Sequence, residues 1–179
     1  DLRSEDWLKD LVDRAAAQAD ELADEGKYGE AALILSEIYY IFKDDKFWKQ
    51  RYEQAGLHAS IQGAYGKDSD WQQRLDDVDK HDFEKALHII GRRYVKPVDY
   101  RKMILGALKG FRSFVTTNGM AESFARFPDD EVHIAALVNG LDKQADDFRN
   151  AKLVTAADLL AAYWGMVGKG REKFGVPDE

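Results

Sequence analysis

Apolar residues recur every three or four positions along almost the whole chain, which is the spacing of helices that bury one face. These stripes predict helices over about residues 7–22, 28–42, 47–59, 71–78, 83–94, 100–115, 132–148 and 156–167. No segment long enough to build a sheet alternates between apolar and polar positions. The predicted fold class is therefore all-α, with about eight mostly antiparallel helices, a helical hairpin at the N-terminus and no sheet.

Capping residues mark several of the expected helix ends. Asp99 and Thr155 stand where N-caps are expected, and Asp158 occupies the capping-box position after Thr155. Ser4 is the expected N-cap of the first helix, and Pro128 is expected in the first turn of the seventh. The apolar face expected to point inward from that seventh helix comprises Val132, Ala135, Leu137, Val138, Leu141, Ala145 and Phe148.

Length and composition describe a globular chain. Its 179 residues are 45% hydrophobic, include only 3 prolines and contain no cysteine. The missing cysteines exclude disulfides, thiolate nucleophiles and cysteine-ligated metal sites. We divide the chain into residues 1–66, a hairpin plus a third helix, and residues 67–179, a helical bundle, and we expect the two parts to form one continuous domain.

The sequence offers no convincing catalytic, cofactor or metal constellation. His81, Glu84 and His88 share one helix face, but the Glu-x-x-His spacing of dimetal bundles does not occur. Other groups with possible chemistry are better explained as solvated surface or helix ends; these are His133, Asp76, Asp77, Asp79, Gly165, Gly168 and Gly170. We therefore predict no catalytic residue, no cofactor and no metal, and no enzymatic activity of this chain itself.

Charge is unevenly distributed along the chain. The net charge is -7 and the pI is about 5.2, with acidic residues dominating the first thirty positions. Residues 85–112 are basic and contain Lys85, Arg92, Arg93, Lys96, Arg101, Lys102, Lys109 and Arg112. Because nucleic-acid-binding domains usually carry an overall basic excess, neither nucleic acid nor an anionic membrane is the expected partner. We expect a solvated surface, or pairing with the acidic N-terminal part.

Protein–protein contact is the function class that remains. The residues expected to form an interaction surface are Trp7, Tyr40, Trp48, Trp71, Arg92 and Arg93. Gly106 and Gly110 lie four residues apart in an expected helix, where each costs about 1 kcal/mol relative to alanine. We expect that cost to be offset by close helix packing, within the chain in preference to a homodimer.

The first two helices resemble a single tetratricopeptide repeat over residues 15–48. Ala19, Leu22, Gly26, Tyr28 and Ala31 stand in the places where that repeat has its small and large packing residues. One repeat length further on, Glu53, Ser60 and Gln62 do not repeat the pattern. Both a true repeat unit and an ordinary helical hairpin stay open.

Residues 83–115 resemble the helical segment that precedes the PDZ and catalytic domains of carboxyl-terminal processing proteases, a family of serine peptidases. The matching residues are Tyr94, Val95, Pro97, Val98, Asp99, Gly106, Ala107 and Gly110. The chain departs from the family at Thr116, where the family continues into Leu-Asp-Pro-His-Ser. No Ser or Lys here can be assigned to the catalytic dyad of that family.

The resemblance implies a non-catalytic helical scaffold or interaction domain, either part of such a protease or a relative without its catalytic domain. Its partner would be a protease domain or another protein. The alternative is an independent tetratricopeptide-like module that binds peptides or proteins. The family resemblance implies an exported or periplasmic location, and because the sequence begins with Asp1 rather than Met, a signal sequence or lipid anchor could precede it.

Overall fold

The computed structural model describes residues 5–75, 80–93, 97–124, 126–128 and 130–174. Over this part the chain forms eight α-helices and no strand, which confirms the all-α prediction. The helices are α1 (Asp6–Asp24), α2 (Tyr28–Ile41), α3 (Lys46–Tyr65), α4 (Trp71–Leu75), α5 (Lys80–Arg93), α6 (Tyr100–Val115), α7 (Glu131–Asn150) and α8 (Ala156–Phe174), with a 3-10 turn, η2 (Met120–Glu122).

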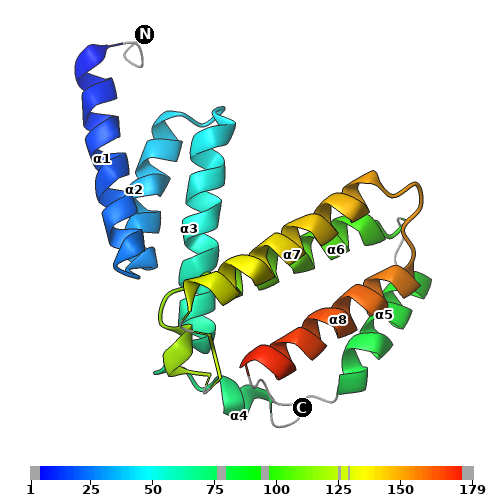
Figure 1. The fold of residues 1–179 in the computed structure, drawn as a ribbon. Coiled ribbons are helices and arrows are strands. Elements are labelled where there is room, and N and C mark those ends of the chain that lie inside the picture. Colours follow the sequence, from blue (N-terminus) through cyan, green and yellow to red (C-terminus); the bar gives the residue numbers. More distant parts are fainter. Residues whose placement is uncertain (1–4, 76–79, 94–96, 125, 129, 175–179) are drawn as a thin grey trace.

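The N-terminal group consists of α1, α2 and α3, where α2 packs against both neighbours (Figure 1). Gly26 turns the chain between α1 and α2 with a positive φ of 78°. The amide of Gly26 donates to the Ala23 carbonyl and that of Lys27 to the Leu22 carbonyl, which is the Schellman pattern of helix ends. The buried core of this group is Leu8, Val12, Ala16, Ala19, Ala31, Leu35, Ile38 and Ala55.

The C-terminal group consists of α5, α6, α7 and α8. The helix α7 runs antiparallel to α6 and to α8, and α6 packs against both (Figure 1). The buried core of this group is Leu87, Ile104, Leu108, Val115, Leu141, Ala145, Leu159, Ala162 and Met166.

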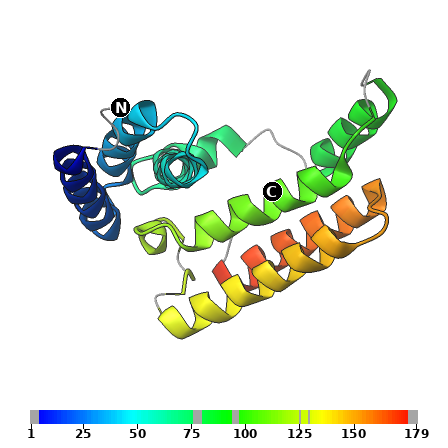
Figure 2. The same cartoon turned by 90° about the horizontal axis from the view of Figure 1, so that it is seen from above.

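The two groups are stacked crosswise. Figure 2 shows α3 end-on, whereas α6, α7 and α8 run across the view. A third buried cluster lies where the groups meet, contributed by Ile61 of α3, Trp71 of α4, and Met120 and Phe124 after α6. The division predicted between residues 66 and 67 falls just after α3 and stays a prediction, because this cluster draws on residues from both sides of it.

Trp71 is buried rather than surface-exposed, which corrects the sequence-based assignment. Its side chain is only 6% exposed, and its ring stacks on Phe124 with the centroids 5.0 Å apart. The helix α4 is short, and its sequence does not identify the segments that cover Trp71. The side chain fills the space between the two helical groups.

Several predicted helix ends are confirmed. The Asp99 carboxylate accepts a hydrogen bond from the Lys102 amide at 2.9 Å and caps α6. Thr155 and Asp158 form the reciprocal capping box that opens α8. The prediction for α7 is wrong in position, because Asp130 is the N-cap and Pro128 precedes the helix. Ser4 lies outside the described residues.

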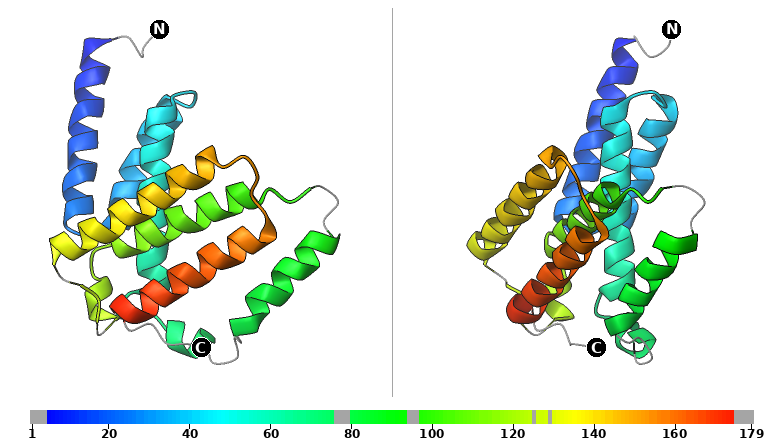
Figure 3. Two further views of the ribbon diagram at one scale, coloured as in Figure 1. Left: turned by 45° about the vertical axis from the view of Figure 1, so that its right-hand side comes forward. Right: turned by 90° about the vertical axis from the view of Figure 1, so that its right-hand side faces the viewer.

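The inward face predicted for α7 is correct only in its second half. Leu141 and Ala145 are buried and Leu137, Val138 and Phe148 pack against them, but Val132 and Ala135 are exposed. The first turn of α7 extends past the end of α8 at Phe174, and no other described helix covers Val132 and Ala135 there (Figures 2 and 3).

The prediction that Gly106 and Gly110 allow another part of the chain to approach closely is wrong. Among the described residues outside their own helix, no atom lies within 4 Å of the position that a Cβ would occupy at either residue. Pro97 is exposed and lies just before the Asp99 cap, while Tyr94 lies outside the described residues. The packing of this monomer therefore does not explain the two glycines.

Replacing Gly106 by alanine should raise the free energy of unfolding by about 1 kcal/mol, because alanine restricts the unfolded backbone and meets open space in the fold. Urea denaturation of the monomer measures this. Gly119→Ala serves as contrast, since Gly119 has a φ of 85° that alanine adopts with strain, and it should lower stability. Loss of stability in Gly106→Ala would show that something covers this face.

Candidate functional site

A buried polar hub joins the two helical groups. We call Tyr28, His58, Ser113, Thr117 and Asn118 the junction hub. The His58 ring stacks on Tyr28 with centroids 4.9 Å apart, and its Nδ1 lies 2.8 Å from the Thr117 hydroxyl. The backbone amide of Asn118 donates to the Tyr28 hydroxyl at 3.0 Å. The hub thus ties the end of α6 to α2 and α3.

The hydrogen-bond pattern fixes which nitrogen of His58 carries a proton. The Thr117 hydroxyl donates its single hydrogen to the Ser113 carbonyl at 2.7 Å, so it accepts from His58 Nδ1–H. His58 is only 7% exposed. Burial lowers the pKa of His58 below its usual value of 6.5, and the Arg112 guanidinium lowers it further. The ring is therefore held in its neutral form.

The hub is built for holding helices together and lacks the features of a catalytic dyad. A nucleophilic hydroxyl needs access to substrate and a base that takes its proton. Here the Thr117 hydroxyl is buried and gives its proton to a backbone carbonyl, and His58 donates to it. No described carboxylate is hydrogen-bonded to His58 to orient it as a base.

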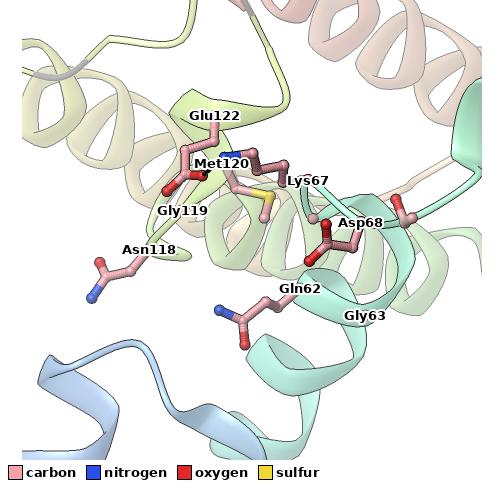
Figure 4. A pocket seen from close by; sticks show the side chains of 10 residues that line it. Gln62, Gly63, Lys67, Asp68, Asn118, Gly119, Met120 and Glu122 are labelled. Atoms are coloured by element: carbon pink, nitrogen blue, oxygen red, sulfur yellow. Dashed lines mark ion pairs between the residues drawn. The ribbon is translucent and has the colours of Figure 1, made fainter.

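An open cleft of about 370 Å³ lies beside the hub, between the end of α3 and the turn after α6 (Figure 4). Gln62 and Asn118 extend from its two walls and each holds the α1–α2 turn. Gln62 Nε2 donates to the Gly26 carbonyl at 2.9 Å, and Asn118 Nδ2 donates to the Asp24 carbonyl at 3.1 Å. Both side-chain amides therefore bind the α1–α2 turn to the wall from which they extend.

Three ionic residues line the cleft, Lys67, Asp68 and Glu122, and two of them form an ion pair. Lys67 Nζ lies 3.3 Å from the Glu122 carboxylate and bridges the two walls (Figure 4). Both side chains are mostly exposed, so the pair is worth little in stability. The hydroxyl of Ser69 is buried without a hydrogen-bond partner and so has no base to activate it. Among the described side chains that line the cleft, no hydroxyl is hydrogen-bonded to a base.

The polar residues considered from sequence are placed apart or in structural contacts. Glu84 accepts a hydrogen bond from Trp164 Nε1 at 3.1 Å and lies 3.5 Å from His81 Nδ1, while His88 is exposed. His133 contacts the Asp130 cap at 2.8 Å. Asp76, Asp77 and Asp79 lie outside the described residues. Among the side chains the structure describes, no three His, Asp or Glu are grouped to hold a metal.

The backbone amide of Val132 and then His133 hold the pKa of the Asp130 carboxyl below its ordinary value. The hydroxyl and amide of Thr155 do the same for Asp158. Both shifts arise from helix capping.

The predicted interaction residues do not form one surface. Trp7 is 60% exposed on α1 and Tyr40 is 69% exposed on α2, where Lys43 lies over its ring. Trp48 is half-buried against Phe42. Arg92 and Arg93 lie in the last turn of α5, and their side chains fall outside the described part. Trp7 and Tyr40 thus remain as exposed aromatic candidates.

Sequence reasoning missed the junction hub. His58 occupies the buried stripe of α3 between Ala55 and Ile61, which was a usable signal that a polar partner had to exist. Nothing local pointed to Thr117 as that partner, because it lies 59 residues away and ends an unrelated helix.

Comparison of the chain with family models, with curated proteins and with solved structures finds no match. None of the described helices has the length and apolar content required to cross a bilayer.

Lowering the pH should weaken the fold through His58. Because the folded-state pKa is lowered, the unfolded state binds more protons below about pH 6.5, and stability is lost as the pH falls through that range. Urea denaturation between about pH 7.5 and pH 5.5 measures the slope. His58→Gln should flatten it, whereas His133→Gln should keep it. Equal slopes in wild type and His58→Gln would contradict this role.

Proposed function

We propose that the chain is a non-catalytic helical interaction domain that binds a protein through its N-terminal hairpin. The observation that carries this proposal is the exposure of large apolar side chains on α1, with Trp7 at 60% and Leu11 at 48%. Both lie in the first half of α1. The N-terminal end of that helix projects beyond the turn joining α2 and α3 (Figures 1 and 3). Aromatic side chains that stay exposed on a well-packed scaffold are typical of interface anchors.

The hub and the cleft support a structural role for the rest of the domain. Their polar side chains form hydrogen bonds that join the N-terminal helices to the C-terminal helices. The proposal thus assigns the N-terminal hairpin to binding and the crossed C-terminal group to support or to carrying a further domain.

A photo-crosslinking amino acid placed at position 7 tests this assignment in extracts of the source cells. We expect a saturable adduct that excess wild-type protein competes away and that a Trp7→Ser/Leu11→Ser double variant does not. The same crosslinker at Lys143, an exposed position on α7, is the control and should give no saturable adduct. Absence of a saturable adduct at position 7, or peptide hydrolysis by the isolated chain, would overturn the proposal.

Two settings for such a domain stay open as proposals. The corner in which Asp99 caps α6 after Pro97 supports the resemblance to the helical region of carboxyl-terminal processing proteases, in which case the domain positions a protease. The tight turn at Gly26 and the buried Tyr28 support a tetratricopeptide-like binding module that acts independently.

Determining the reading frame of the gene beyond codon 179 separates these settings. A processing-protease scaffold predicts continuation into a PDZ domain and a β-rich domain with a Ser/Lys dyad. A stop codon soon after Glu179 would reject that setting and favour the independent module.

A further inference from the structure

One side of the N-terminal hairpin is covered by α3. Asp20 of α1 pairs with Arg51 of α3, and Tyr39 of α2 stacks on Tyr52 of α3 with centroids 5.9 Å apart. These two contacts mark the flank of each hairpin helix that faces α3. On the opposite side, the flank of α1 has no helix against it in the part of the chain that the structure describes (Figures 1 and 2). The corresponding flank of α2 borders α1, and Ile34 on it is partly buried against the hairpin core.

Apolar side chains occupy that opposite flank. Successive residues of an α-helix are rotated by about 100°, so Leu11, nine residues before Asp20, points about 180° away from it. Ile41, two residues after Tyr39, likewise points about 200° away from it. Trp7 lies one turn before Leu11. All three side chains are at least 38% exposed. In stacked helical proteins such a flank is the place where the next helix packs.

Acidic residues are interleaved with these apolar ones. On α2, Glu30, Ile34, Glu37 and Ile41 follow one another at spacings of four, three and four residues, which places them in a single stripe. On α1, Glu21 lies about 40° around the helix from Trp7. We call this surface, formed by Trp7, Leu11, Glu21 and the Glu30–Ile41 stripe, the α1–α2 edge.

The hairpin carries an excess of negative charge. Over Asp6–Asp24, α1 has six acidic and two basic residues, and α2 has two acidic and no basic residues. Both basic residues of α1 are already paired, Lys9 with Asp6 at 3.2 Å and Arg14 with Asp10 at 2.8 Å. An apolar stripe flanked by an excess of carboxylates is complementary to a helix that carries leucine-like residues between lysines or arginines.

We infer that the α1–α2 edge binds a cationic amphipathic helix of a protein partner. The inference rests on the proposed interaction function and specifies its partner. A second copy of this chain docking edge to edge would place two acidic hairpins against each other, and like charges across an interface oppose association. The apolar side chains supply affinity, and Glu21, Glu30 and Glu37 select for basic residues.

Calorimetric titration with two designed peptides at physiological salt tests this. One is an 18-residue Leu–Lys amphipathic helix, and the other has every Lys replaced by Glu. We expect the Leu–Lys peptide to bind the full chain and the Leu–Glu peptide to bind at least about tenfold more weakly. Trp7→Ser/Leu11→Ser should lose at least about tenfold in affinity. Val132→Ser/Leu153→Ser, which replaces two exposed apolar residues outside the hairpin, is the matched control and should bind as wild type does.

Charge reversal gives the decisive comparison. Glu30→Lys/Glu37→Lys should reverse the preference in favour of the Leu–Glu peptide, with circular dichroism confirming that the fold is kept. Equal binding of both peptides to wild type, or equal losses in the edge and control variants, would overturn the inference. A mass that doubles with concentration without peptide, and only when Trp7 and Leu11 are present, would overturn it in favour of self-association. A saturable adduct at position 7 alongside such results would leave the interaction function standing and reject only this partner chemistry.

Discussion

The contact between His58 and Thr117 is the constraint on which the arrangement of this molecule depends. Two helical groups with separate hydrophobic cores meet crosswise, and a crossing contact covers little of either helix. At that crossing the Thr117 hydroxyl accepts a hydrogen bond from the neutral His58 ring, and the Tyr28 hydroxyl, whose ring stacks on His58, accepts one from the Asn118 backbone amide. A buried polar group left without its partner costs about 1–3 kcal/mol, so the hub tolerates only one relative placement of α3 and α6.

The apolar cluster next to the hub adds stability without the same geometric demand. Trp71 stacks on Phe124, and Phe114 contacts Phe124 edge to face with centroids 5.2 Å apart. Such contacts stabilise the fold through buried apolar area and dispersion attraction, and they tolerate small displacements of the rings. The hydrogen-bonded hub sets the register of the crossing, while the aromatic cluster supplies much of the attraction. The N-terminal hairpin is thereby fixed on its α3 side and left uncovered on the other, where its exposed apolar residues lie.

The sequence predicted the local structure well and the long-range structure poorly. The helical stripes, the Asp99 cap and the Thr155 capping box depend on residues within a few positions of one another. They can therefore be predicted from the local sequence alone. Trp71 and Gly106 were misjudged because burial depends on segments that the local pattern does not identify. Trp71 is covered by a loop some fifty residues later, and Gly106 faces open space although its spacing from Gly110 suggests close packing. For the same reason only some of the residues expected at the surface lie there, since Trp7 is exposed and Trp71 is buried.

Native-state hydrogen exchange tests the coupling of the two groups most directly. The amides of Leu35 in α2 and Leu108 in α6 lie in different cores and report the opening of each. If the hub couples the groups, both amides show the same free energy of opening, and Thr117→Val lowers both by the same amount, about 1–3 kcal/mol. A loss of protection at Leu108 with no change at Leu35 would contradict the account, because it would show that the two groups open independently.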